Sequence, residues 1–325
     1  MNATESFISF DKVIRLTQSK KNKLQISRDN LRVHIKKYFK DHGWGCVKFH
    51  SQGSFVLDTN LNTIPGNSDN EREEYDIDDG VYYICKENER PTVATFHARV
   101  KEAVSDVTSE TIDKNTCVRV VYADGYHVDI PMYWFNSQID RAVPYLAHKS
   151  KGYIESDPRA FGNWVSKKIS YSNNNQLKRL IRYFKAWVDY REFCNSQVRL
   201  PSGFILTILA CNNYVPNDRD DVSFSASAKE IYKALNINYS CYRPTLPTNE
   251  ELLASKGYQR DKLLNELKTL VDKTESALSE TNEKRGLDIW QSIFGERFPC
   301  IIGEKTTNIQ KSNYSFEPGA PWSIN

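Results

Sequence analysis

The sequence predicts a two-lobed α+β fold, in which an N-terminal mixed β-sheet precedes a C-terminal lobe of helices. Two patterns in the first half of the chain predict strands: an acidic run at 74–82 and a hairpin at 117–130. Beyond about residue 165, apolar residues instead recur at helical spacing. We therefore expect a sheet domain with an N-terminal helix at 1–165, a helical lobe at 166–300 and a tail at 301–325.

The elements before the acidic run follow from periodicity and turn residues. Apolar residues between Leu24 and Phe39 recur at three- and four-residue steps and predict a helix, which the glycine-containing segment 42–45 ends. A short strand is expected at 47–50. The segment 58–74 is rich in Asn, Asp, Glu and Gly, so it predicts a polar loop before the acidic strand.

The acidic strand carries the most specific chemical signal in the chain. Its Asp76 and Asp78 lie at i and i+2, so their carboxylates point to the same face of a strand. Ile77 lies between them on the opposite face. Asp79 shares the face of Ile77, which makes it the weaker candidate for a metal ligand, and we expect it to form a turn with Gly80.

The hairpin pattern supplies a third carboxylate. Strands at 117–122 and 126–130 flank the turn Ala123-Asp124-Gly125. In the second strand Val128 and Ile130 share one face, whereas His127 and Asp129 share the other, so Asp129 points away from the apolar core. Three carboxylates brought together without a metal would repel one another, and a hard-oxygen cage of this kind suits Mg²⁺.

The second half of the chain predicts helices. Apolar residues between Leu177 and Val188 form one stripe of a helix, and Lys178, Arg182, Lys185 and Asp189 occupy another face. Pro201-Ser202-Gly203 opens an apolar helix that runs to 211. Further helices are expected at 94–106, 226–235, 250–280 and 287–294.

Composition limits the class of protein. Of the 325 residues, 39% are apolar and 26% are charged, which is typical of a soluble globular protein. We find neither a secretory signal nor a run near the ~20 apolar residues that span a bilayer, so we expect a cytoplasmic protein without a membrane partner. The seven cysteines form no CxxC pair, which argues against a zinc module and fits reduced thiols.

The charge of the chain is nearly balanced. The net charge of +3 lacks the basic excess of a constitutive nucleic-acid binder, so nucleic acid is not expected to be required. Basic clusters lie at 20–23, 36–40 and 167–168, and we interpret them as solvated helix faces.

The order of the motifs resembles a known superfamily. A Gly-Ser pair, then Asp-x-Asp, then a single Asp is the pattern of the polymerase-β-like nucleotidyltransferases. The closer resemblance is to the bacterial CD-NTases, the cyclic oligonucleotide synthases related to cyclic GMP-AMP synthase and oligoadenylate synthetase. It runs from about residue 10 to about residue 300. The matching segments are 51–55, 74–82, 128–131, 182–187, 201–204 and 290–299. The interval between Ser54 and Asp76 is longer than in compact members of the superfamily.

The resemblance implies roles for particular residues. Asp76 and Asp78 would bind two Mg²⁺ ions, for which Mn²⁺ could substitute, and Asp129 would complete the site of the activating ion. Gly53 and Ser54 would hold the phosphates of the donor nucleotide. Two further residues resemble the triphosphate contacts that the family draws from its helical lobe, and these are Lys185 and Ser202.

The resemblance also implies an activity. The chain would join nucleoside triphosphates, ATP or GTP first among them, into a cyclic di- or oligonucleotide and release pyrophosphate. A purine-containing cyclic dinucleotide would then act as a diffusible second messenger in bacterial anti-phage (CBASS-type) signalling. Its partners would be a downstream effector reached through the product, and a regulatory or tail-conjugating protein.

Two alternatives stay open at the level of the sequence. An Asp-x-Asp core also serves linear nucleotidyltransferases that act on RNA or protein. A catalytically inert nucleotide-binding or sensing module is a hypothesis from a different class, but such modules usually lose a metal carboxylate, and this chain keeps Asp76, Asp78 and Asp129.

Overall fold

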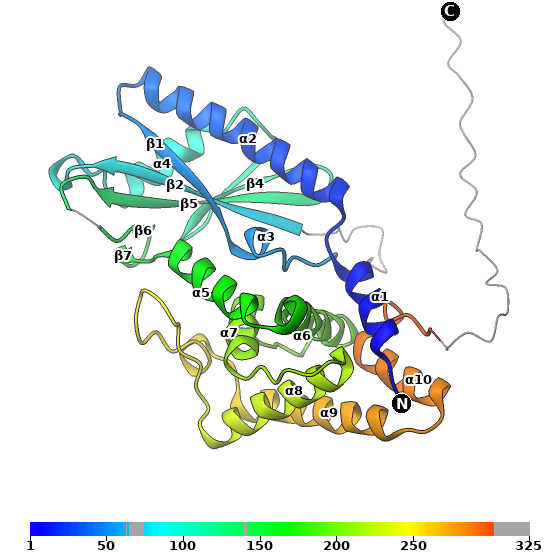
Figure 1. Cartoon of the computed structure of the whole chain (residues 1–325). Helices are drawn as coiled ribbons and strands as arrows, with labels where there is room; N and C mark the ends of the chain where they lie inside the picture. The colour runs from blue at the N-terminus through cyan, green and yellow to red at the C-terminus, as the bar shows by residue number, and fades with distance from the viewer. Residues whose placement is uncertain (63, 65–74, 140–141, 302–325) are drawn as a thin grey trace, which may run out of the picture.

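A mixed β-sheet and a layer of helices make up the fold (Figure 1). The structure is a computed structural model, and it describes residues 1–62, 64, 75–139 and 142–301. The predicted α+β class with two lobes is confirmed. Most of the predicted polar loop at 58–74 and, after Ile301, the predicted tail lie outside the described residues.

Strands and helices both occur in the first half of the chain, and helices follow β7. The strands are β1 (Val47–Gln52), β2 (Tyr75–Cys85), β3 (Glu110–Asp113), β4 (Cys117–Val121), β5 (Tyr126–Asn136), β6 (Tyr145–His148) and β7 (Gly152–Glu155). The helices are α1 (Thr4–Ile14), α2 (Gln18–Asp41), α3 (Gly53–Val56), α4 (Val93–Ala103), α5 (Pro158–Ser170), α6 (Gln176–Cys194), α7 (Gly203–Asn212), α8 (Asp220–Ile237), α9 (Arg260–Ser279) and α10 (Glu283–Phe294).

The sheet has a parallel pair at its centre. The strand order is β1-β2-β5-β4-β3, and β6 and β7 continue the sheet beyond the end of β5. Strands β2 and β5 are parallel, whereas β1 and β4 run antiparallel to them on either side. The predicted hairpin at 117–130 is the pair β4 and β5, with Arg119 opposite Asp129.

The helices α2 and α4 cover one face of this sheet. The predicted first helix is α2, which begins where the side chain of Thr17 accepts a hydrogen bond from the backbone of Lys20. Its buried stripe, which includes Leu24 and Phe39, packs on the inward residues of β2 and β5, such as Ile77 and Val128. The opposite face of the sheet, which carries Asp76 and Asp78, is left to face the helical layer.

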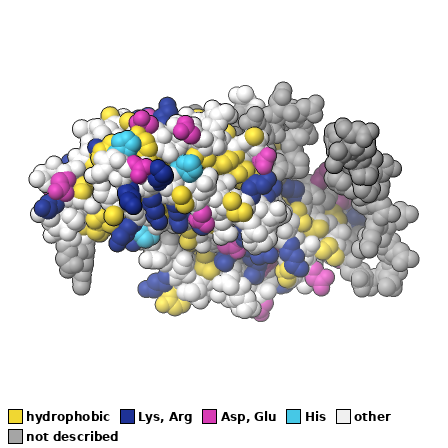
Figure 2. All heavy atoms as spheres, turned by 90° about the horizontal axis from the view of Figure 1, so that it is seen from above, with side chains coloured by type: hydrophobic (Ala, Val, Ile, Leu, Met, Phe, Trp, Pro, Cys, Tyr) yellow, Lys and Arg dark blue, Asp and Glu magenta, His cyan; other side chains and the backbone are white. Residues whose placement is uncertain are grey.

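The outward face of α2 is strongly basic. Seen from above, Lys and Arg side chains gather over this part of the molecule (Figure 2). The side chains of Lys36, Lys37 and Lys40 are exposed, as are those of Lys167 and Lys168 in α5, which confirms the interpretation of these two clusters as solvated helix faces. The cluster at 20–23 differs, because Lys20 and Lys21 are half-buried and Lys21 forms an ion pair with Asp58. All seven cysteines are free. Within the described ranges, no helix combines the length and the apolar character that crossing a bilayer requires.

The second apolar cluster lies among the helices and includes α1, which the sequence did not predict. The ring of Phe7 packs edge-on against Tyr183 at 5.0 Å and against Trp290 at 4.8 Å between ring centroids. The domain division at 165 stays a prediction, but α1 and α5, which begin before that boundary, place their buried apolar residues in the helical cluster.

The predicted helix at 250–280 was too long. Helix α9 begins only at Arg260, after an irregular segment in which Tyr242 and Glu251 form an isolated β-bridge. Gly257 adopts a φ of +79°, a left-handed conformation that a helix cannot continue through. The predicted helices at 94–106, 226–235 and 287–294 are present as α4, α8 and α10.

The packing of α1 gives a first testable prediction. Replacing the fully buried Phe7 by Ala should lower the free energy of unfolding by about 3–5 kcal/mol, because it leaves a cavity among aromatic rings. The neighbouring Ile8 is 44% exposed, so Ile8→Ala should change it by no more than about 0.5 kcal/mol. Urea denaturation followed by tryptophan fluorescence measures both; similar small losses would mean that α1 does not belong to the core.

Candidate active site

Three aspartates meet on two neighbouring strands, as the sequence predicts. Asp76 and Asp78 lie on β2, and the parallel pairing of β2 with β5 sets Asp78 directly beside Asp129 and Asp76 beside His127. Ligand atoms of Asp76, His127 and Asp129 all lie within 4.8 Å of one another. The strands therefore bring together a cluster of carboxylates at one place on the sheet.

His127 is a member of this cluster that the sequence did not single out. Its Nε2 atom lies 3.8 Å from Oδ2 of Asp76. The signal was available, since His127 and Asp129 share the same face of the predicted strand. An imidazole nitrogen is a poorer ligand for Mg²⁺ than for transition metals, so the carboxylates carry the match to magnesium.

Arg119 was also missed, and it binds Asp129 directly. Its Nε donates to Oδ1 of Asp129 at 2.7 Å, and its Nη2 donates to Oδ2 at 2.8 Å. Both residues lie at directly opposed positions of the β4–β5 hairpin. The hairpin register, read from the sequence, would have placed this arginine beside the aspartate.

The third acidic residue of β2, Asp79, has a structural role. Asp79 accepts hydrogen bonds from Nε of Arg32 at 2.7 Å and from the hydroxyl of Ser51 at 2.8 Å. It faces α2, away from the other carboxylates, as its position beside Ile77 predicts. The expected turn at Asp79 and Gly80 was wrong, because β2 continues through both residues and pairs with β1 on one side.

The cluster is electrostatically costly by itself. Burial, together with the neighbouring Asp76 and Asp129, raises the pKa of Asp78 well above its ordinary value. Burial also raises the pKa of Asp76, which His127 lowers and Asp129 raises further. Within the described part of the chain, Arg119 is the one guanidinium that lowers the pKa of Asp76 and Asp78. The negative charge of the three carboxylates is therefore only partly offset.

The donor set fits a hard divalent cation. Carboxylate oxygens are the ligands that Mg²⁺ and Mn²⁺ prefer. A bound cation would neutralise the charge that makes Asp76 and Asp78 hard to ionise. Asp76 and Asp129, with Asp78 directly beside Asp129, could therefore hold such an ion, and His127 lies within the same group of ligand atoms.

Gly53 makes the approach of β1 to the carboxylates possible. Helix α3 begins at this residue, which has a φ of +72°. A Cβ atom added at Gly53 would lie 2.3 Å from Oδ2 of Asp78, closer than any side chain could approach. The Gly53-Ser54 turn is thus fixed against the metal ligands, where backbone N–H groups suit phosphates.

Two cavities meet at this turn. The first has a volume of about 320 Å³ and is lined by Gly53, Ser54, Asp78 and Lys185, with Phe204 and Arg243 at its helical side. The second, of about 310 Å³, is lined by Ser54, Asp76, Lys185, Asp189 and Ser202. Each cavity touches one aspartate of the Asp-x-Asp motif, and both share Ser54 and Lys185.

Lys185 enters the site from α6. Its Nζ donates to the carbonyl oxygen and to the hydroxyl of Thr59, at 3.0 and 3.2 Å. Burial lowers its pKa to about 8, although the nearby Asp76 acts in the opposite direction. A Cβ atom at Gly203 would lie 3.0 Å from Cε of Lys185, so the glycine at the start of α7 leaves room for the lysine.

Ser202 stands at the start of α7 and lines the second cavity. Its backbone N–H donates to the hydroxyl of Tyr258 at 3.2 Å. Six of the seven predicted residues thus line these two cavities, and Asp129 lies directly beside Asp78 on the neighbouring strand. Their roles in binding metal and nucleotide stay predictions.

A protein-family model matches part of the sheet lobe. Residues 47–133 match the model described as "Cyclic GMP-AMP synthase DncV-like, nucleotidyltransferase domain". This part of the chain is therefore similar to a DncV-like nucleotidyltransferase domain. The resemblance to the CD-NTases that the motifs suggested is confirmed.

The similarity to curated proteins extends beyond residues 47–133. A cyclic GMP-AMP synthase of Escherichia albertii is 26% identical over 276 residues, which are 80% of this chain and 58% of the relative. A cyclic AMP-AMP-AMP synthase of an Acinetobacter species is 25% identical over 170 residues, 48% of this chain and 46% of the relative. The aligned part thus spans about half the length of these relatives.

Solved structures share the whole fold. The Vibrio cholerae DncV cyclic AMP-GMP synthase in complex with nonhydrolyzable GTP superposes with a TM-score of 0.77 at 19% identity, covering 92% of this chain and 97% of that one. The same synthase in complex with the linear intermediate 5′ pppA(3′,5′)pG gives a TM-score of 0.77 at 18% identity, covering 94% and 99%. The fold of this chain is therefore the polymerase-β-like nucleotidyltransferase fold.

The charge cluster predicts how a divalent ion changes stability. A carboxyl with a raised folded-state pKa gives stability that is complete below its unfolded pKa and is lost as pH rises through the folded pKa. At pH 7.5 in EDTA, Asp78→Asn should therefore melt about 2 °C or more above the wild type. Mn²⁺ or Mg²⁺ should raise the melting temperature of the wild type but not of this variant.

Asp79 provides the matched control for this experiment. Asp79 lies on the same strand as Asp78, and Asp79→Asn removes its ion pair with Arg32. This variant should therefore melt at a lower temperature than the wild type but keep the ion-induced rise. A wild-type melting temperature that neither ion changes at millimolar concentration would contradict the assignment of the cluster as a metal site.

Gly53 gives a steric test of the same site. Gly53→Ala and Gly43→Ala both place a side chain at a positive φ, +72° and +67°, and each should cost about 1–2 kcal/mol of stability. A Cβ atom at Gly43 meets nothing within 4 Å, whereas one at Gly53 must displace Asp78. Only Gly53→Ala should therefore weaken the Mn²⁺-induced rise in melting temperature; equal effects would place Asp78 outside the ion site.

Proposed function

We propose that this chain is a metal-dependent nucleotidyltransferase that joins nucleoside triphosphates into a cyclic di- or oligonucleotide. One observation carries the proposal: a single carboxylate cluster faces two cavities that share Ser54 and Lys185. A synthase that links two nucleotides needs room for both of them around one reactive centre. The names of the relatives, a cyclic GMP-AMP synthase and a cyclic AMP-AMP-AMP synthase, support the cyclic product.

The reaction class follows from the donor and acceptor groups. A ribose hydroxyl of one nucleotide attacks the α-phosphorus of a triphosphate; a new P–O bond forms, the bond to the β-phosphate breaks and pyrophosphate leaves. A second transfer closes the ring. Mg²⁺ or Mn²⁺ held by Asp76, Asp78 and Asp129 would supply a lowered pKa for the attacking hydroxyl and charge neutralisation for the triphosphate.

The chain's own residues hold the reactants. The Gly53-Ser54 turn presents N–H groups and a hydroxyl beside the carboxylates, where the phosphates of a donor would lie. Lys185 lies between both cavities, and with a pKa of about 8 it is mostly protonated at neutral pH, so a nearby triphosphate would meet a cation and raise that pKa. Ser202 faces the second cavity. Most of the rate enhancement would come from positioning and charge stabilisation.

The identity of the substrates and the biological role belong to the same proposal. Solved DncV structures hold ATP and GTP, or GTP alone, which supports purine triphosphates as substrates. We further propose that the product signals to an effector in bacterial anti-phage defence, in the cytoplasm, and that a regulatory or tail-conjugating protein controls the enzyme. The family resemblance alone supports these last statements.

The test is direct. Purified full-length protein incubated with all four NTPs and Mg²⁺ or Mn²⁺ should give a phosphatase-resistant cyclic product by mass spectrometry. The double variant Asp76→Asn/Asp78→Asn should lose product formation by at least about 100-fold, since it loses charge stabilisation at the reacting centre. Asp124→Asn, at the exposed turn of the β4–β5 hairpin, should keep it.

Other outcomes would redirect the proposal. Pyrophosphate release that requires added RNA or protein would favour a linear nucleotidyltransferase. Tight binding of ATP with no pyrophosphate release under either metal, with or without RNA and protein, would favour an inert nucleotide-binding module.

A further inference from the structure

The loop 57–62 receives three cations from the helical lobe on its backbone carbonyls. Nη1 of Arg182 donates to the carbonyl oxygen of Asp58 at 2.6 Å, and Nζ of Lys185 donates to that of Thr59 at 3.0 Å. Nη1 of Arg297, after α10, donates to that of Asn62 at 3.1 Å. A short loop of the sheet lobe is thus held by charge-assisted hydrogen bonds, which are stronger than neutral ones.

The same loop contacts the residues of the cleft. The backbone N–H of Thr59 donates to the carbonyl oxygen of Ser54 at 2.9 Å. The side chain of Asn60 donates to the carbonyl oxygen of Asp76 at 3.2 Å. A movement of the loop would therefore displace the Gly53-Ser54 turn, the Asp76 strand and Lys185 together.

The backbone at Asp58 does not hold this shape by preference. Its φ is +54°, in the left-handed region that residues other than glycine rarely adopt. Its carboxylate forms an ion pair with Lys21 of α2 and lies 3.9 Å from Nζ of Lys178 of α6. Arg182 holds the peptide from the carbonyl side, so contacts on both sides keep a strained conformation.

The side chain of Arg182 is buried and makes its contacts inside the protein. Its side chain is only 2% exposed, and besides the carbonyl of Asp58 it binds Oδ1 of Asp11 in α1 through Nε at 2.7 Å and Nη2 at 2.6 Å. The sequence placed Arg182 on a charged helix face. Instead, it is a buried fork that joins α1, α6 and the loop.

We propose that Arg182 is a positioning residue of the nucleotide cleft: by fixing the Asp58–Thr59 peptide it sets the places of Lys185, Ser54 and Asp76. The inference rests on the proposed function in so far as nucleotide binds in this cleft. The role belongs to the guanidinium shape and not to charge alone, because a lysine cannot donate along three directions from one planar fork.

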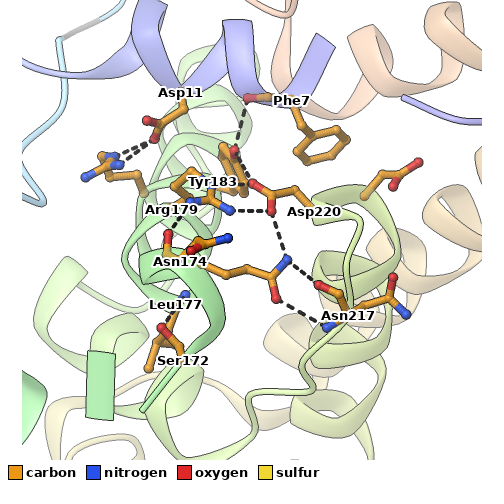
Figure 3. A network of polar contacts seen from close by, with 12 residues as sticks. Phe7, Asp11, Ser172, Asn174, Leu177, Arg179, Tyr183, Asn217 and Asp220 are labelled. Carbon is orange, nitrogen blue, oxygen red and sulfur yellow. Dashed lines mark hydrogen bonds and ion pairs between the residues drawn. The ribbon is translucent and has the colours of Figure 1, made fainter. Parts of the chain in front are cut away.

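Arg179, one turn earlier in α6, is a matched control for Arg182. Arg179 forms an equally close double pair with Asp220, Nε to Oδ2 at 2.6 Å and Nη2 to Oδ1 at 2.7 Å, and also donates to the carbonyl of Asn174. Figure 3 shows this network between α6 and α8, with Tyr183 joining Asp220 to Phe7 of α1. Within the part of the chain that the structure describes, the hydrogen bonds and ion pairs of Arg179 do not reach the loop 57–62, so its loss should disturb the helical lobe alone.

The experiment compares Arg182→Lys with Arg179→Lys in the full chain. In hydrogen exchange followed by mass spectrometry, without nucleotide, Arg182→Lys should speed exchange in peptides covering 57–62 about tenfold or more, the factor that the loss of about 1.4 kcal/mol gives. Arg179→Lys should leave these peptides unchanged and loosen α6 and α8. With ATP and Mn²⁺, only Arg182→Lys should raise KM, or the Kd from calorimetry, about tenfold with less change in kcat.

A milder variant keeps the test valid if Arg182→Lys folds poorly. Asp11→Asn leaves Arg182 in place but weakens its support, so it should loosen 57–62 in the same direction and by a smaller factor. Unchanged exchange at 57–62 in both variants, or equal loosening of the loop by Arg179→Lys, would overturn the proposal. If the wild type binds no ATP, the proposed function fails, while the exchange data still decide whether Arg182 holds the loop.

Discussion

The parallel pairing of β2 with β5 is the constraint on which the site depends. It sets Asp78 beside Asp129 and Asp76 beside His127, although the segments come from separate parts of the chain. A slip of one residue would turn Asp129 toward α2 and expose Val128, because side chains alternate along a strand. The apolar residues that these strands bury against α2 and α4 therefore fix the register, and the register in turn forces like charges together. The charge repulsion at the site is a consequence of core packing elsewhere in the sheet.

Much of this site could be predicted because alternation is a local property. The sequence near Ile77 and Val128 specifies which face is apolar, and hence that Asp76, Asp78 and Asp129 point the other way. Alternation does not specify which strand lies beside which, so the parallel pairing of β2 with β5 could not be predicted from the pattern. The hairpin is an intermediate case: its short turn fixes the register, and Arg119 opposite Asp129 could have been derived from it.

What could not be predicted depends on contacts between distant segments. Helix α1 carries an apolar stripe of its own, but its partners lie in α6 and α10. Arg182 has the spacing of an exposed helical cation, and nothing near it in sequence indicates that α1 and a loop of the sheet lobe cover it. Periodicity identifies the faces of a helix, whereas burial of a charged face requires a partner that satisfies it.

The two apolar clusters share no residue, and the loop 57–62 contributes Leu57 and Leu61 to the helical one. Lys185, Arg182 and Arg297 bind carbonyl oxygens of the same loop, so both polar and apolar contacts hold it to the helical lobe. In the proposed function two triphosphates enter the cleft, and the reacting groups must take the same places in every turnover. Directional hydrogen bonds to one loop favour a single arrangement, because each fixes the direction as well as the distance between donor and acceptor.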